Sequence, residues 1–149
     1  MRALVQRVHD ASVCPEGYKI RSIQKGLCIF IGISNNDKEE QIRYLVNKII
    51  NLRIFPDKDK KERFHLSVKD IKGELLIVSQ FTLYASTRKG KRPSFSEAAK
   101  PEIASKIFSK TIKEFKLNGL KVETGIFGAN MNVKINNYGP LTLIIDSKN

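Results

Sequence analysis

The hydrophobic positions at the start of the chain fall into short runs that predict strands. Residues 2–13 are rich in β-branched side chains, and the turn-forming residues 15–18 separate them from a short return segment at 20–23. This order predicts a hairpin. Residues 27–33 are almost all apolar, which indicates a strand covered on both faces.

Helical spacing replaces this pattern in the next segment. Residues 35–37, Asn-Asn-Asp, offer N-cap side chains ahead of an apolar helix face. That face consists of Ile42, Leu45, Val46, Ile49 and Ile50. Residues 52–55 then predict a short strand. Pro56 opens a charged loop, Asp57 to Arg63, which lacks apolar periodicity and is predicted to be mobile.

Strand and helix signals alternate again after residue 74. Residues 75–84 predict a long strand, whose apolar first half gives way to polar side chains interleaved with apolar ones. Residues 94–97, Ser-Phe-Ser-Glu, match a capping box that starts a helix. Pro101 suits the first turn of a second helix, which carries apolar residues from 103 to 115.

The last segment alternates strictly between apolar and polar residues over 130–136, as a half-buried strand does. Tyr138-Gly139-Pro140 interrupts it, and a strand resumes at 141–145. A proline between two strands removes a ladder donor, and the sequence does not set whether its peptide bond is cis or trans. The sum predicts one α+β domain over residues 1–149, with a mostly antiparallel, barrel-like sheet and two helical regions.

Charge adds a modest indication of a partner. The chain has 27 Lys and Arg against 15 Asp and Glu, a formal charge of +12 over 149 residues. Such a charge concentrates polyanions such as nucleic acid, although heat-adapted proteins are also rich in Lys and Glu. The basic stretch from Arg88 to Arg92 is compatible with a phosphate contact or with an ordinary solvated loop.

The two cysteines and the apolar runs bear on location. Cys14 and Cys28 form no CxxC pair, and Cys28 lies within an apolar run where a thiol behaves as a small hydrophobe. The N-terminal residues lack the order of a signal peptide, and no apolar run approaches about 18 residues. We expect a cytoplasmic protein.

Candidate chemistry is sparse. The only histidines, His9 and His65, lie in no triad or metal motif, and no nucleotide-binding motif occurs, so we expect neither metal nor cofactor. Ser79-Gln80-Phe81-Thr82 closes a predicted buried strand, and strand ends place side chains and free N–H groups at clefts. An ordinary half-buried strand explains the same residues, and composition alone favours it.

At these positions the chain resembles the D-aminoacyl-tRNA deacylase family, of the D-tyrosyl-tRNA deacylase type. The matching segments lie in order along nearly the whole chain: residues 1–3, 6–8, 48–49, 52–55, 79–83, 92–95, 124–129 with Met131, and 137–142. Three positions depart from the family pattern. Tyr138 replaces an aspartate, Lys91 an asparagine, and Arg63-Phe64-His65 the usual Lys-Met-Asn.

The resemblance implies the fold of that family and a carboxylic ester hydrolase that needs no cofactor. Its substrate would be a D-amino acid esterified to the 3′-terminal adenosine of tRNA. The protein would be a homodimer in which Gly139-Pro140, joined by a cis peptide bond and held by Arg7, enters the partner's active site and rejects L-amino acids. The implied catalytic residues are Ser79, Gln80, Phe81 and Thr82.

Physical chemistry makes such a site plausible without a strong base. An aminoacyl ester is reactive and has a neighbouring ribose hydroxyl, so positioning and backbone N–H groups are sufficient in principle. Glycine, which lacks a side chain, would pass a filter against L residues. Thr82 is either a nucleophile or a residue that shapes the pocket; we favour the second, because no base is evident to activate it.

Two other functions remain open at this stage. One is a non-catalytic nucleic-acid-binding module, for which charge alone would suffice. The other is an editing domain of similar fold that acts on a different mischarged aminoacyl-tRNA.

Overall fold

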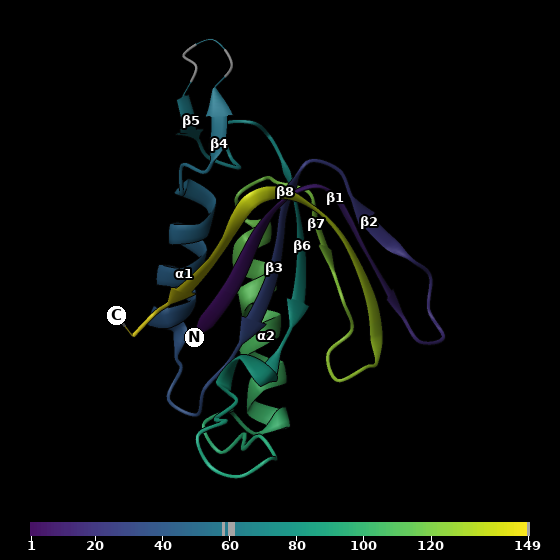
Figure 1. Ribbon diagram of the computed structural model, residues 1–149, viewed down its shortest axis with the longest axis vertical. Coiled ribbons are helices and arrows are strands. Elements are labelled where there is room, and N and C mark those ends of the chain that lie inside the picture. Colours follow the sequence, from purple (N-terminus) through teal and green to yellow (C-terminus); the bar gives the residue numbers. More distant parts are fainter. Residues whose placement is uncertain (58, 60–61, 149) are drawn as a thin grey trace.

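The computed structural model describes residues 1–57, 59 and 62–148 (Figure 1). The strands are β1 (Arg2–Pro15), β2 (Arg21–Ile23), β3 (Gly26–Gly32), β4 (Phe55–Asp57), β5 (Glu62–Leu66), β6 (Glu74–Ser79), β7 (Val122–Thr124) and β8 (Met131–Asp146). The helices are α1 (Glu39–Asn51), the 3₁₀ helix η1 (Phe81–Tyr84) and α2 (Pro101–Lys116). The predicted α+β class with two helical regions is confirmed.

The main sheet is organised around β1 and is mixed. β1 pairs antiparallel with β2, β3 and β8, whereas β3, β6 and β7 pair in parallel. β8 follows almost the full length of β1 and curls over it, so that the sheet is barrel-like (Figure 1). The barrel-like prediction is confirmed, with two parallel pairs that the sequence did not indicate. β4 and β5 form a separate hairpin.

Period-two alternation gives the strands two apolar faces. On β3, Leu27, Ile29 and Ile31 belong to the core beneath α1 and α2, while Cys28 belongs to a second core inside the curled sheet. Burying one large apolar side chain stabilises a fold by about 1.5–3 kcal/mol. Both cores therefore fix β3 and its neighbour β6, and so fix the position at which β6 ends.

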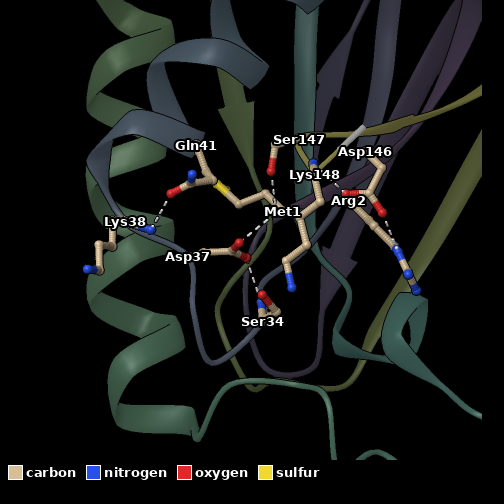
Figure 2. Close-up of polar contacts among 9 residues, drawn as sticks. All are labelled: Met1, Arg2, Ser34, Asp37, Lys38, Gln41, Asp146, Ser147 and Lys148. Atoms are coloured by element: carbon tan, nitrogen blue, oxygen red, sulfur yellow. Dashed lines mark hydrogen bonds and ion pairs between the residues drawn. The ribbon is translucent and has the colours of Figure 1, made fainter.

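The prediction that residues 35–37 cap a helix is wrong, because the N-cap residue of α1 is Lys38. α1 begins at Glu39, and the Lys38 N–H is satisfied by Gln41 Oε1 at 2.9 Å. Asp37 instead accepts a 2.7 Å hydrogen bond from the Met1 ammonium and a 2.6 Å bond from the Ser34 amide (Figure 2). Pairing with the buried Met1 ammonium stabilises the protein more than capping a helix would, because an unpaired buried charge is costly.

The predictions for residues 52–63 are partly wrong. The strand begins only at Phe55, and Asp57 belongs to it rather than to a loop. β5 starts at Glu62, so the hairpin takes both ends of the predicted loop. Residues 58, 60 and 61, on which the expected mobility centres, lie outside the described residues. His65 is half-buried on β5, with Nε2 3.8 Å from Asp57 Oδ2.

The predicted strand over residues 75–84 ends early. β6 stops at Ser79, and after Gln80 donates its N–H to Ile31 O at 2.8 Å the chain turns into η1. Gly32 permits this turn, because a Cβ there would lie 3.0 Å from Leu83 Cβ and 3.1 Å from Gln80 O.

The predicted helix start at residues 94–97 is also wrong. Ser94 pairs with Ser86 in an isolated bridge. Helix α2 starts at Pro101, as the proline itself predicted.

Candidate active site

A cavity of about 650 Å³ opens where β6 ends and η1 begins. Its lining is Ile31, Ile33, Val78, Ser79, Gln80, Phe81, Phe95, Ala98, Ala99, Lys100, Pro101, Ala104, Phe127, Gly128, Ala129, Asn130, Met131 and Val133. The wall is mainly apolar with a few polar groups, which is typical of a small-molecule site. Its position at the C-terminal end of a parallel strand is also typical of such sites.

The structure brings the four residues predicted for the pocket to one place. Ser79, Gln80 and Phe81 line the cavity, and Thr82 adjoins them through a 2.5 Å contact between its Oγ1 and Gln80 Nε2. The Phe81 ring is 56% exposed and lies edge-on to Phe95, with 5.0 Å between ring centroids. Three of the four residues therefore line a cavity, and only Ser79 lies in the strand that composition favoured.

The turn from β6 into η1 also presents main-chain donors. The first amides of a helix have no acceptor within it, and here these belong to Phe81 and Thr82. The preceding amide, of Gln80, is already used by Ile31. In the described chain, no bond from the Phe81 or Thr82 N–H to another protein group is found. Two adjacent N–H groups at a cavity suit a developing oxyanion.

Ionisable side chains contribute little to the cavity. Of its described lining residues, Lys100 alone is ionisable, and neither His9 nor His65 lies in the wall. Over residues 1–57, 59 and 62–148, no three His, Cys, Asp or Glu side chains are grouped as a metal site would require. The arrangement can position a substrate and stabilise negative charge on an oxygen atom. Its described wall residues include no imidazole or carboxylate that could take a proton.

Residues near the two ends of the chain contact η1. Arg2 donates from Nη1 to Leu83 O at 3.2 Å. Its Nε donates to Asp146 Oδ2 at 2.8 Å (Figure 2). Burial alone would raise the pKa of Asp146, but the Arg2 hydrogen bond, the Lys148 amide and nearby positive charge outweigh burial and lower it. The Arg2 guanidinium also lies 4.5 Å from the ring centroid of Tyr84. Burial, aided by the Asp37 charge, raises the pKa of Tyr84 to about 12.

Gly139 and Pro140 lie in a bulge of β8 opposite Arg7. β1 and β8 are in register at Gln6 with Thr142 and again at Val8 with Asn137. Between those pairs β1 has one residue and β8 has four, so residues 138–141 bulge out of the ladder. A bulge is where a sheet tolerates proline. The Gly139–Pro140 peptide bond is cis.

The bulge is fastened by Arg7, which is only 6% exposed. Arg7 Nε donates to Tyr138 O at 3.0 Å and Nη1 to Ile54 O at 2.5 Å. Asn137 Nδ2 closes the bulge with bonds to Arg7 O at 3.1 Å and Leu141 O at 3.2 Å. Desolvation lowers the pKa of Arg7, against the opposing effect of Tyr138.

Tyr138 is held between two side chains of β1. Its ring centroid lies 4.1 Å from the Arg7 guanidinium carbon and 4.3 Å from the His9 ring centroid, at an interplanar angle of 23°. Both contacts are favourable for an aromatic ring. They give this chain a local anchor at the position where the sequence departs from the family's aspartate.

The structure places Arg7 against the bulge but does not place the bulge in the cavity of the same chain. Gly139 and Pro140 are both exposed and are not among the described residues of the cavity wall. The sequence assignment also missed much of that wall, namely Phe95, residues 98–101 and residues 127–131. The signal was present for Phe95, residues 127–129 and Met131, because these lie in segments that match the family. Residues 98–101 and Asn130 lie outside those segments.

Solved structures share this fold over almost the whole chain. A structure titled "c-Myc DNA Unwinding Element Binding Protein" superposes with a TM-score of 0.90 at 38% identity, covering 98% of each chain. One of a "probable eukaryotic D-amino acid tRNA deacylase" superposes with a TM-score of 0.87 over 97% of each chain. Its identity is only 15%, so that likeness concerns the fold alone.

The sequence comparisons identify the family. A family model described as "D-Tyr-tRNA(Tyr) deacylase" matches residues 4–146. Proteins named D-aminoacyl-tRNA deacylase are 54% identical in Aquifex aeolicus, over 99% of both chains, and 52% identical in Flavobacterium psychrophilum, over 100% and 99%. The chain belongs to the D-Tyr-tRNA(Tyr) deacylase family, and the resemblance drawn from the sequence is confirmed.

Proposed function

We propose that residues 1–149 act as one D-aminoacyl-tRNA deacylase domain, which hydrolyses the ester between a D-amino acid and the 3′-terminal adenosine of tRNA. The observation that carries the proposal is the cavity at the end of β6, which Phe81, the first residue of η1, helps to line. The names of the relatives, at about half identity over the full chain, support the substrate class. The location that we propose for an enzyme with this substrate is the cytoplasm. Within the described residues no helix is long and apolar enough to cross a membrane.

The proposed chemistry is attack of water on the ester carbonyl. As the water oxygen bonds to the carbonyl carbon, negative charge develops on the carbonyl oxygen, where the Phe81 and Thr82 N–H groups stabilise it. The C–O bond to ribose then breaks, the water proton passes to the leaving ribose oxygen, and free amino acid and tRNA are released. Ser79, Gln80 and Phe81 position the ester, and the neighbouring ribose hydroxyl assists the proton transfer.

Chiral selection is assigned to Gly139 and Pro140 of a second copy of the chain. Both are exposed on a bulge fixed by Arg7, and neither reaches its own cavity. A homodimer in which each bulge enters the partner's cavity would place rigid main-chain atoms where an L side chain must go. Glycine, which has no side chain, would pass this filter, so glycyl-tRNA is a second expected substrate.

The test is deacylation of tRNA charged with the D or the L form of one amino acid. We expect rapid release of the D-amino acid and slow release of the L form. Equal release of both forms would reject chiral selection and favour an editing domain for another mischarged aminoacyl-tRNA. Binding without cleavage of either ester would favour a non-catalytic nucleic-acid-binding module, the kind of role named for the relative that is 38% identical.

A further inference from the structure

We propose that the exposed hairpin between Ser86 and Ser94, the basic hairpin, binds the sugar-phosphate backbone of the tRNA acceptor end beyond the terminal adenosine. The proposal rests on the proposed function, because it names the surface that receives the rest of the substrate once the ester is in the cavity.

The base of the basic hairpin is fixed beside the cavity. Ser86 N donates to Ser94 O at 2.8 Å, and Ser94 N donates to Ser86 O at 2.9 Å. The chain enters the hairpin from η1, whose Phe81 lines the cavity, and leaves it at Phe95, which lines the same wall. These two rings lie edge-on to each other, so the hairpin leaves and rejoins the chain at the cavity wall. In Figure 1 the hairpin belongs to the loop at the bottom of the view, before α2.

The projecting part is cationic and solvent-exposed. Arg88, Lys89, Lys91 and Arg92 are all exposed around a turn at Gly90, whose φ of 70° favours glycine. At about 3.3 Å per extended residue, an arm of four residues reaches at most roughly 13 Å from the rim. That reach lets the hairpin meet phosphates that precede the terminal nucleotide.

These four cations lie within five consecutive residues and have no acidic partner among the described residues. Lys110 is paired with Glu39 and Lys121 with Glu74, whereas no described carboxylate lies within 4.0 Å of the four hairpin cations. Glu97 is the one acid between residues 85 and 101. Lys100 extends the positive charge along the cavity wall. Unpaired cations arranged beside a site for a nucleotide ester fit phosphates, which Lys and Arg bind with release of counterions.

The test compares two substrates that share the ester but differ in backbone. One is D-aminoacyl-tRNA, and the other is the same D-amino acid esterified to adenosine alone. The variant is Arg88→Gln/Lys89→Gln/Lys91→Gln. The matched control, Lys48→Gln/Lys69→Gln/Lys116→Gln, removes the same charge at exposed positions on α1, after β5 and on α2.

We expect kcat/KM of the hairpin variant on D-aminoacyl-tRNA to fall about 10- to 100-fold at low salt. The slope of its logarithm against log salt should become less negative by about 2–3, since each phosphate contact contributes roughly 0.7–0.9. Cleavage of the aminoacyl-adenosine should stay within twofold of the unmodified protein.

Three results would overturn the proposal: no loss on tRNA, an equal loss on both substrates, or an equal loss in the control variant. If the unmodified protein cleaves neither ester, the proposed function fails. The role of the basic hairpin in tRNA binding can then still be tested by measuring the affinity of the same two variants for uncharged tRNA by fluorescence anisotropy. Equal affinity of the two variants would reject it, and a weaker affinity of the hairpin variant alone would support it.

Discussion

Thr82 is the residue whose role separates two chemical routes for ester hydrolysis. Its hydroxyl contacts Gln80 Nε2 at 2.5 Å, and an amide nitrogen of this kind does not accept a proton. No imidazole or carboxylate among the described wall residues is available to activate it. These contacts fit a residue that shapes the pocket better than they fit a nucleophile.

We therefore expect Thr82→Ala to keep kcat/KM on D-aminoacyl-tRNA within about fivefold, because removal of a true nucleophile costs several orders of magnitude. Single-turnover deacylation measures the effect, and Thr82→Ser serves as the conservative control. Loss of more than a thousandfold, together with a Thr82 ester trapped from the unmodified protein, would establish the nucleophile instead.

Tyr138 is expected to position the selective bulge in this chain. Its ring lies between Arg7 and His9, and its carbonyl accepts from Arg7 Nε. Tyr138→Ala removes both ring contacts but keeps the carbonyl, so the bulge loosens while its backbone bond survives. We expect the free energy of unfolding to fall by about 1 kcal/mol, the scale of one aromatic and one cation–π contact.

If Tyr138 has only a structural role, Tyr138→Ala should lower the free energy of unfolding and leave the ratio of D to L cleavage unchanged. For a positioning role, we expect Tyr138→Ala also to lower the ratio of D to L cleavage, while Tyr138→Phe keeps both the ratio and the stability. Denaturant unfolding and paired deacylation assays give the two quantities. An unchanged ratio in Tyr138→Ala would leave Tyr138 with a purely structural role.

Among the elements, the start of β1, the end of β8 and the turn before α1 meet around Asp37 and the Met1 ammonium. The Met1 ammonium and the Asp37 carboxylate are both fully buried at 2.7 Å, and Ser147 Oγ lies 2.6 Å from the same ammonium (Figure 2). Asp37→Asn leaves that ammonium buried without its charge partner. We expect a loss of about 3 kcal/mol in the free energy of unfolding, because breaking one side of a buried pair is costly.

Equilibrium denaturation of the Asp37→Asn protein tests this expectation. Glu40→Gln is the matched control, since it makes the same change of charge at an exposed position on α1 and should change stability by less than about 0.5 kcal/mol. Similar stabilities of the two variants would mean that the Met1 ammonium is not held by a charge partner in solution.

The same elements show how far the sequence could predict the structure. An almost unbroken apolar run predicted β3, and alternation predicted the strand at 130–136, because each segment's own burial pattern determines it. Residues 81–84 continue the β-like pattern of β6, yet they form η1, because the turn depends on contact with Gly32, far away in sequence. Asp37 had the composition of a cap, but its partner is Met1, which local pattern could not reveal.

For the site, the sequence supplied the residues but not their arrangement. The family resemblance named Ser79 to Thr82 together with Gly139, Pro140 and Arg7. The structure shows why these form two groups: the first lies at the end of β6, and the second in a bulge created by the register of β1 and β8. Register is a long-range property, so short-range periodicity could place a turn at Gly139-Pro140 without showing what it faces.

At the scale of the whole molecule, separation of the two groups makes the proposed dimer testable by mixing subunits. A filter-deficient chain, Pro140→Ala, should cleave L- as well as D-aminoacyl-tRNA. A chain with a blocked cavity, Ala98→Trp, should cleave neither ester. Ala98 is in the cavity wall, and the indole ring of tryptophan occupies space that the substrate needs. Each variant is first shown to unfold cooperatively, so that a folding defect is not mistaken for a blocked site.

Mixed dimers of these two chains, purified through two different tags, contain one open cavity, on the Pro140→Ala chain. If the bulge acts across the interface, that cavity receives an intact Gly139-Pro140 from its partner, and cleavage of the L ester should fall to the level of the unmodified protein. If the bulge acts within its own chain, the open cavity lacks a filter and L cleavage persists at half the rate of the Pro140→Ala dimer. Because only the open cavity contributes activity, the D to L ratio of the mixed dimer alone decides between the two arrangements. The control mixes a tagged and an untagged copy of the unmodified chain. If these copies do not associate and no mixed dimers form, the proposed homodimer is contradicted.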